Sequence, residues 1–255
     1  MSLTRRTTID LNCDLGEGAA HDAALMPLVT SANVCCGLHA GSSDLMAATV
    51  QLAMQHGVAV GAHPGHADRD HFGRREMAIT PSECAAVIES QIAAVAAAAG
   101  AALHHVKLHG GLYHQVGREA PLAEAVATML ADRWPQLVIY AQAGSLFASI
   151  ARSRGLAVAE EAFIDRRYLA DGGLTPRSAA GATIDDPAEA AAQAVRLAAE
   201  GVVCTIDGGE LRVAADTLCI HGDGPRAIEI ATAVRAALAA TGIDLRAATG
   251  RARSR

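Results

Sequence analysis

The sequence predicts an α/β protein whose parallel strands close into a seven- or eight-stranded (β/α) barrel. Short β-like runs alternate with longer Ala-rich helical runs along nearly the whole chain, and reactive polar residues follow most of the predicted strands. A length of 255 residues suits one such barrel. Because no linker rich in Gly, Pro or Ser divides the chain, we expect a single domain over residues 1–255, with a frayed tail from about residue 246.

The expected strands are apolar runs of strand length, at 8–14, 32–36, 58–63, 104–108, 137–141, 157–164, 202–206 and 217–221. The expected helices lie at 44–56, 81–99, 120–133, 145–154, 187–200 and 225–241. Thr80 and Asp186 each precede a Pro in the first turn of a helix, which is typical of N-cap residues. The alternation of strands and helices is interrupted at residues 207–209. These residues are Asp-Gly-Gly and lie between two β-like runs, a pattern that predicts a hairpin.

Composition and charge exclude several classes of function. The formal net charge is -6 and the domain has no dense Lys/Arg run, which argues against a nucleic-acid or anionic-membrane partner. The amino-terminal residues lack the apolar core of a secretory signal, and no run approaches about 18 uninterrupted apolar residues. The six cysteines form no CxxC pair, which favours reduced thiols. We therefore expect a cytoplasmic protein.

Nearly every predicted strand ends in a cluster of reactive side chains followed by Gly. In a parallel barrel these ends face one mouth, so residues distant in sequence should converge there. Period-two alternation places Asn12 and Asp14 on one face of the first strand, and Lys107 shares a face with His109. The other candidates at strand ends or in the loops after them are Glu17, His39, His63, Arg166, Arg167, His221 and Asp223.

An Asp with two His on neighbouring strand ends could hold a divalent metal, and Asp14, His39 and His63 are the candidates. Their spacing is not that of a known zinc motif such as HExxH. Without a metal, the same groups could exchange protons with a scissile amide. Neither GxxxxGK[ST] nor a strand–helix GxGxxG is present, so an ATP-dependent reaction would need another chain to handle ATP.

The segments NCDLGEG, ANVCCGLHAG, GAHPG, FGRREM, VKLHGGLYH, DRRYLADG and LCIHGD occur in this order. Together they resemble the LamB/YcsF family, the A subunits of 5-oxoprolinase, from about Ile9 to Leu245. The resemblance implies a barrel related to glycoside hydrolases and deacetylases that acts with subunits B and C. It also implies ATP-dependent opening of 5-oxoproline to L-glutamate, with ATP as co-substrate of the complex. Leu108, Gly111 and His114 depart from the residues usual in the family.

The site residues that match the family blocks receive hypothetical roles. Asp14 or Glu17 would activate water, and His109 or His221 would protonate the leaving nitrogen. Lys107 and Arg167 would hold the substrate carboxylate or phosphate, with Asp223 as a further binding residue. Two alternatives stay open at this stage: a stand-alone metal-dependent amidase or sugar deacetylase, and a substrate-binding subunit without chemistry of its own.

Overall fold

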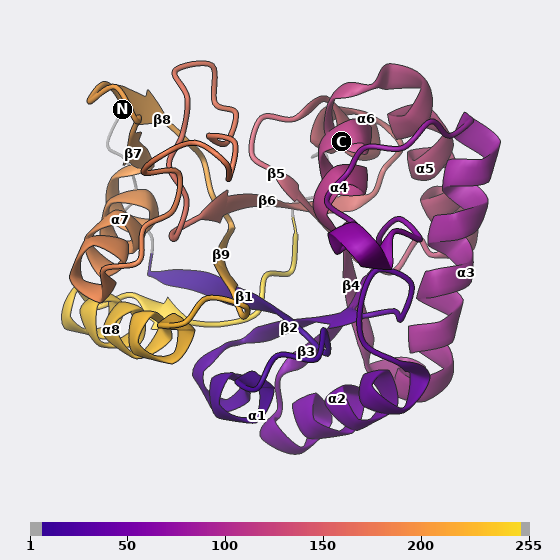
Figure 1. Cartoon of the computed structure of the whole chain (residues 1–255), viewed down its shortest axis with the longest axis horizontal. Coiled ribbons are helices and arrows are strands. Elements are labelled where there is room, and N and C mark those ends of the chain that lie inside the picture. The colour runs from indigo at the N-terminus through magenta and orange to yellow at the C-terminus, as the bar shows by residue number, and fades with distance from the viewer. Residues whose placement is uncertain (1–6, 251–255) are drawn as a thin grey trace.

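Seven parallel strands form a closed barrel in the computed structural model, which describes residues 7–250 (Figure 1). Around the barrel they are β1 (Thr8–Leu15), β2 (Ser31–Cys35), β3 (Ala59–His63), β4 (Leu103–Lys107), β5 (Val138–Gln142), β6 (Ala157–Phe163) and β9 (Thr217–His221). Strand β9 pairs with both β6 and β1, which closes the sheet. The predicted parallel barrel is confirmed, with seven strands.

The main outer helices are α2 (Ser43–His56), α3 (Pro81–Ala99), α5 (Ala120–Arg133), α6 (Leu146–Ser153), α7 (Pro187–Glu200) and α8 (Ala227–Ala240). Their bounds agree with the sequence prediction to within two residues at each end. The side chain of Thr80 accepts from the Glu83 N–H, and that of Asp186 accepts from two N–H groups at the start of α7. Both predicted N-caps are therefore confirmed.

Five short helical elements were not predicted: α1 (Asp22–Leu25), η1 (Met26–Leu28), η2 (Arg69–His71), η3 (Gly100–Ala102) and α4 (Gly110–Arg118). Helix α4 begins with two glycines, which are poor helix formers. A Cβ at Gly111 would lie 2.3 Å from the carbonyl oxygen of Arg75, so the loop before α3 approaches too closely for a side chain. Packing against that loop therefore overrides local propensity.

The predicted hairpin is present as β7 (Val202–Cys204) and β8 (Glu210–Arg212), which pair antiparallel in a sheet of their own. The segment 202–206 therefore contributes no strand to the barrel. A two-residue strand, β10 (Asp244–Leu245), pairs with the beginning of β1. All six cysteines are free, as the sequence suggested.

Helix α3 and the turn after it, residues 81–102, are by length and composition apolar enough to cross a membrane. In the barrel, Ile88, Ile92 and Val95 of this helix are fully buried in the core. The helix contacts β3 and β4, as an outer helix of a (β/α) barrel does. Core helices of this kind meet the same compositional criterion, so its apolar character is accounted for by packing.

The barrel interior is polar, because alternate residues of the strands turn Asp, Asn, His and Lys inward. At the base, Asp10 accepts hydrogen bonds from Ser31 (2.8 Å) and Thr217 (2.6 Å). Above it, Asn12 donates to Thr217 at 2.7 Å, and Asn33 donates to Asn12 at 2.7 Å. The polar groups of one layer thus satisfy those of the next, up to the carboxyl ends of the strands.

Residues 246–250, where a frayed tail was expected, lie against the base of the barrel. The Arg246 N–H donates to the Ile9 carbonyl at 2.9 Å. Ala248 packs against a small buried cluster of Val138, Tyr140 and Ala159. The rest of the expected tail, residues 251–255, lies outside the described residues.

Candidate active site

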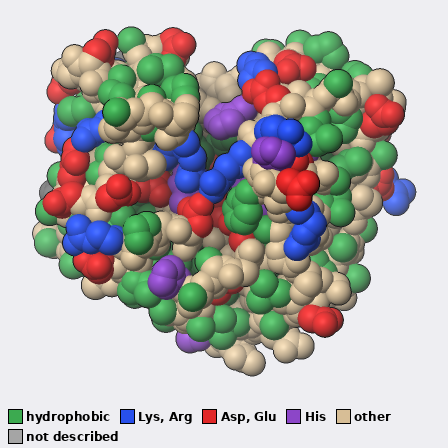
Figure 2. All heavy atoms as spheres, viewed as in Figure 1, with side chains coloured by type: hydrophobic (Ala, Val, Ile, Leu, Met, Phe, Trp, Pro, Cys, Tyr) green, Lys and Arg blue, Asp and Glu red, His purple; other side chains and the backbone are tan. Residues whose placement is uncertain are grey.

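The carboxyl ends of the strands open into a pocket of about 1130 Å³. Its walls come from those strand ends, from α4, from the 165–177 segment after β6 and from β8. Figure 2 shows the face hollowed near its centre, with charged and His side chains around the hollow. Among the sequence candidates, the pocket is lined by Asp14, Glu17, His63, Lys107, His109, Arg166, His221 and Asp223. The predicted convergence at one mouth is therefore present.

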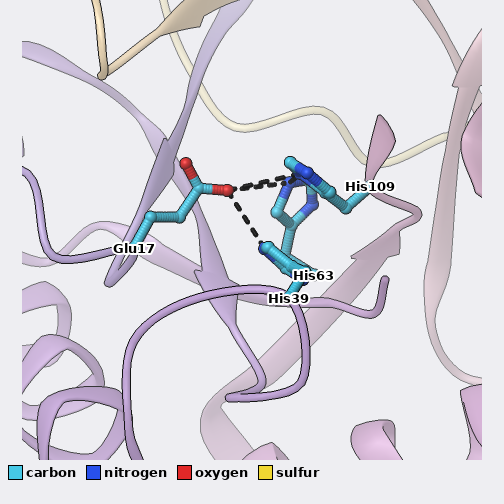
Figure 3. Close-up of side chains that lie close together, drawn as sticks. All are labelled: Glu17, His39, His63 and His109. Carbon is cyan, nitrogen blue, oxygen red and sulfur yellow. Dashed lines mark hydrogen bonds and ion pairs between the residues drawn. The ribbon is translucent and has the colours of Figure 1, made fainter. Parts of the chain in front are cut away.

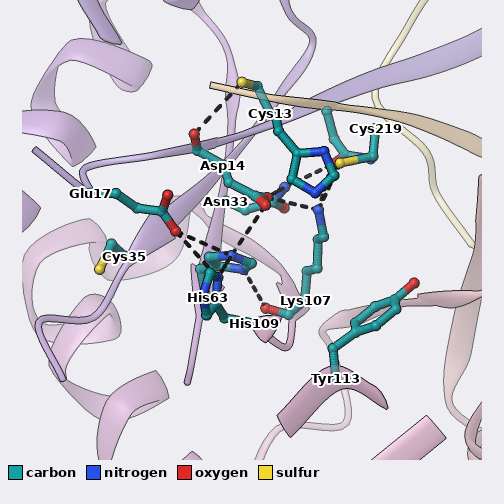
Figure 4. Close-up of polar contacts among 12 residues, drawn as sticks. Cys13, Asp14, Glu17, Asn33, Cys35, His63, Lys107, His109, Tyr113 and Cys219 are labelled. Carbon is teal, nitrogen blue, oxygen red and sulfur yellow. Dashed lines mark hydrogen bonds and ion pairs between the residues drawn. The ribbon is translucent and has the colours of Figure 1, made fainter. Parts of the chain in front are cut away.

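Lys107, at the end of β4, lies at the centre of a buried polar network (Figure 4). Its Nζ atom is 2.7 Å from Asp14 Oδ1, 3.0 Å from Glu161 Oε1 and 3.0 Å from Cys219 Sγ. Nζ donates hydrogen bonds to Asp14 Oδ1, to Cys219 Sγ and, at 3.3 Å, to Asn12 Oδ1, so the protein uses all three N–H donors, and Glu161 adds an ion pair. A substrate carboxylate would have to displace one of these partners, so this geometry favours a role for Lys107 in holding Asp14.

Lys107 is the only lysine in the sequence, whereas the chain has 20 arginines. An ammonium group is a compact charge that donates in three directions, while a guanidinium is a flat fork. The acceptors on several sides of Nζ fit a compact ammonium group. The residue type at this position therefore follows from the shape of the network.

Opposite charges set the ionisation of this pair. Burial alone would raise the pKa of Asp14, but His63 and Lys107 hold it well below its usual value. Burial alone would lower the pKa of Lys107, but Asp14, Cys219 and Glu161 raise it well above its usual value. Asp14 is therefore a carboxylate and Lys107 an ammonium at neutral pH.

A second cluster joins Glu17, in the loop after β1, to three histidines (Figure 3). The Oε1 atom of Glu17 is 3.1 Å from His39 Nε2, 3.3 Å from His109 Nδ1 and 3.8 Å from His63 Nε2. The rings of His39 and His109 stack at 3.8 Å with an interplanar angle of 2°. One ligand atom from each of the four residues lies within 4.8 Å of the others, which is an arrangement that can hold a metal ion.

The hydrogen bonds of two histidines fix their tautomers. His63 donates from Nδ1 to the Lys107 carbonyl at 2.8 Å, and His109 donates from Nε2 to the Phe72 carbonyl at 2.8 Å. The remaining nitrogens, His63 Nε2 and His109 Nδ1, face each other at 2.9 Å beside the Glu17 carboxylate. Burial would lower the pKa of His63, but Asp14 raises it, so a proton on His63 Nε2 can bridge the two rings where no metal ion does. Three electron-rich atoms facing one point fit a cation, and oriented imidazoles with carbonyl partners are typical of metal ligands.

Two features of the loops hold this cluster in place. A Cβ at Gly65 would lie 2.5 Å from His39 Nδ1, so only glycine leaves room for that ring. Phe72 has a left-handed backbone (φ 56°), and its ring contacts both His39 and His109 edge-on. The unfavourable backbone of Phe72 directs its carbonyl at His109.

His221, at the end of β9, is paired with a carboxylate that the sequence analysis had not chosen. Its Nδ1 is 2.9 Å from Asp165 Oδ2, and its backbone N–H donates to the same oxygen at 2.9 Å. Burial would raise the pKa of Asp165, but the pairing with His221 lowers it. The carboxylate orients the ring and leaves Nε2 for proton transfer in the pocket, which His221 lines.

Two roles expected from the sequence, those of Arg167 and Asp14, can be compared with where the structure places these residues. Arg167 does not line the pocket and instead forms an ion pair with Glu189 of α7, while its neighbour Arg166 lies in the pocket wall. Asp14 was grouped with His39 and His63 as a metal ligand. The structure places Glu17 and His109 with those histidines, and it places Asp14 in a second group of possible ligands with Cys219 and His221. Asp14 Oδ2 still lies 3.4 Å from His63 Nε2, so Asp14 as a metal ligand stays a prediction.

Glu161 is the main residue that the sequence reasoning missed, and Asp165 was seen after its strand but not chosen as a site residue. Glu161 is fully buried, contacts Lys107 and accepts from the Tyr113 hydroxyl at 2.7 Å. The signal was the pair Glu160–Glu161 within an apolar strand, since alternation turns one of two adjacent residues inward. Asp165 follows the same strand, directly before Arg166, and so carried the strand-end signal that marked the other candidates.

The fold and the site define a (β/α)-barrel protein with an acid–base pocket at the carboxyl ends of its strands. The chain belongs to the LamB/YcsF family, whose model matches residues 9–253. It is 50% identical to the A subunit of 5-oxoprolinase from Heliobacterium modesticaldum, over 94% of this chain and 97% of the relative. The A subunit of 5-oxoprolinase from a strain of Thermus thermophilus is 49% identical, over 94% and 99% of the two chains. The crystal structure of a lactam utilization protein, also from Thermus thermophilus, superposes with a TM-score of 0.88 at 47% identity, covering 94% of this chain and 99% of that one.

Proposed function

We propose that the chain is the A subunit of an ATP-dependent 5-oxoprolinase, which opens the lactam of 5-oxo-L-proline to L-glutamate together with subunits B and C. The relatives named above support the lactam-opening reaction. The pocket supports it because it contains groups that can transfer protons during hydrolysis. One observation carries this proposal: a single pocket is lined by acid–base residues from three different strand ends and their loops, namely Asp14, Glu17, His109 and His221. A cytoplasmic location agrees with this function.

An unstrained lactam is a poor electrophile, so ATP would be used to phosphorylate its amide oxygen. The sequence has no P-loop, and we assign that step to the partner subunits. Water then adds to the ring carbon of the activated lactam, the carbon–nitrogen bond breaks and the nitrogen takes a proton. The resulting acyl phosphate reacts with a second water to give the carboxylate and inorganic phosphate.

Within this reaction Asp14 is the group that activates water, because Lys107 keeps it ionised and its Oδ2 atom is not used by Lys107 or Asn33. Lys107 positions Asp14. His221, oriented by Asp165, donates the proton to the leaving nitrogen. Asp223, at the pocket wall with Arg74 and Arg177, contributes to substrate binding.

Glu17, His39, His63 and His109 would hold a divalent metal ion, which would act as a Lewis acid toward an oxygen of the substrate. The facing nitrogens of His63 and His109, which a metal ion could bind in place of the shared proton, support this assignment. The same cluster favours one alternative, a metal-dependent amidase that works without partners. Zinc-loaded chain that hydrolyses 5-oxoproline without ATP and without partners would support that alternative.

The decisive assay combines the chain with candidate subunits B and C, 5-oxoproline and ATP. Glutamate is expected only in the complete mixture. The variant Asp14→Asn should fold and assemble but lose turnover by at least about a hundredfold, the order of effect of removing a general base. Full turnover by this variant would contradict the role of Asp14, and glutamate formed without ATP would contradict the proposed reaction.

A further inference from the structure

Arg166 is a buried cation without a carboxylate partner. Its side chain belongs to the pocket wall, and the residue is only 5% exposed. One Nη donates to the Thr175 carbonyl at 2.6 Å, while the buried Nε has no hydrogen-bond partner. Within residues 7–250, no Asp or Glu forms an ion pair with it. Burying a charge in this way is unfavourable unless another group compensates for it.

A second unsatisfied group lies beside it. The hydroxyl of Thr175 is buried and has no partner, although Thr175 also lines the pocket. The hydrogen bond from Arg166 to the carbonyl of the same residue keeps the two side chains on adjacent parts of the wall. Two buried hydrogen-bond donors are therefore directed at no acceptor of the protein within the described residues.

The surroundings are positive. Arg177 lines the same pocket, and together with burial it lowers the pKa of Arg166. Two carboxylates of this region are already engaged: Asp165 with His221, and Asp223 with Arg74 and, at 3.7 Å, with Arg177. An anion entering the pocket would find one guanidinium free of any carboxylate and a second only weakly paired.

We propose that Arg166, Thr175 and Arg177 form an oxyanion subsite that binds the charged group of the substrate. Guanidinium and hydroxyl donors suit either a carboxylate or a phosphate group. The subsite lies beside His221, which is paired with Asp165, the residue before Arg166. It therefore holds the anionic end of a small substrate while the ring faces the acid–base residues. This inference rests on the proposed function for the identity of the substrate.

The test is calorimetric titration of the purified chain with three probes: 5-oxo-L-proline, inorganic phosphate and 2-pyrrolidinone, a lactam without a carboxylate. The variant Arg166→Gln is expected to weaken binding of 5-oxoproline, of phosphate or of both by at least about tenfold, the loss of one charged hydrogen bond, and to leave 2-pyrrolidinone unaffected. Loss for 5-oxoproline alone identifies the carboxylate as the bound group, and loss for phosphate alone identifies the phosphoryl group. Arg167→Gln is the matched control, because it removes the same charge one residue away, outside the pocket.

Arg177→Gln is the second variant, since its side chain is 32% exposed and less needed for folding. It should weaken binding of the same anion, and thermal melting checks that each variant is folded. Equal binding of both anions by wild type, Arg166→Gln and Arg177→Gln would overturn the subsite, as would binding of neither anion by the wild-type chain. These titrations require neither ATP nor any partner of the complex. A failed glutamate assay with intact anion binding would therefore contradict the proposed function and leave the subsite standing.

Discussion

The Nε2 atom of His63 lies 2.9 Å from Nδ1 of His109, and the opposite nitrogens of both rings donate to backbone carbonyl groups. Two acceptors at this distance repel unless a proton or a metal ion lies between them. The Glu17 carboxylate beside both atoms adds negative charge to the same point. The cluster therefore holds a positive charge at this point: either a proton on His63, whose pKa Asp14 raises against the effect of burial, or a metal ion.

We predict that the purified chain binds about one divalent metal ion at this cluster. Metal binding stabilises the folded state by mass action, so chelation should lower the melting temperature and added Zn²⁺ should restore it. His63→Ala and His109→Ala should each reduce the bound metal measured by mass spectrometry, while His56→Ala, at the exposed end of α2, should not. Identical melting curves before and after chelation would count against the site.

The buried network around Lys107 predicts a large loss of stability in Lys107→Met. The substitution leaves the carboxylates of Asp14 and Glu161 buried without their cation, which costs about 3–5 kcal/mol in unfolding free energy. The double variant Lys107→Met with Glu161→Gln removes one of those charges and should recover part of the loss. Urea denaturation measures both, and an equal loss in single and double variants would contradict this account.

Because Lys107 is the only lysine, amine-reactive reagents offer a direct probe of this network. Lys107 is 2% exposed and protonated, so the folded chain should resist modification at this residue. Modification should appear along the unfolding transition, as followed by peptide mass mapping. Rapid labelling of Lys107 in the native protein would contradict this prediction, because it would show that the network opens without unfolding of the chain.

A pair of glycine substitutions tests the packing inside the barrel. A Cβ at Gly61 would lie 2.1 Å from His105 Nε2, the atom that donates to Asn33. Gly61→Ala should therefore destabilise the protein by about 1–3 kcal/mol, as overpacking does. Gly117→Ala in α4 is the control, because its Cβ would meet no atom within 4 Å and helix propensity should make it neutral or stabilising. A Gly61→Ala variant as stable as Gly117→Ala would refute the close contact.

The Asp165–His221 pair predicts a defined pH dependence of stability. The pKa of Asp165 is lowered in the folded chain, so the folded state binds its proton less tightly than the unfolded state does. The ionised Asp165 contributes to the unfolding free energy in full above about pH 3.9, the pKa of this carboxyl in the unfolded chain. The contribution is lost as the pH falls through the lower pKa of the folded chain. The difference in unfolding free energy between wild type and Asp165→Asn should be largest near neutral pH and shrink below about pH 4. Asp132→Asn, at an exposed position on α5, should show no such trend.

The barrel was predictable because the barrel strands carry apolar runs and several main helices carry recognisable caps, as at Thr80 and Asp186. Helix α4 was not, since Gly110 and Gly111 are explained only by the neighbouring loop. The candidate residues were found by their place at strand ends. Their partners were not: whether Asp14 contacts Lys107 or a metal, and whether Arg166 or Arg167 enters the pocket, depends on side-chain directions across the barrel.

The segment 246–250 has a consequence for how the complex can work. With Ala248 and Gly250 packed against β5 and β6 at the base, the polar core is sealed at that end and the described pocket opens at the other. Under the proposed function, ligand traffic and the docking of an ATP-using partner would share the entrance of the described pocket. Delivery of the activated ring and escape of the product would then have to take turns, which couples the catalytic cycle to association and release of the partner.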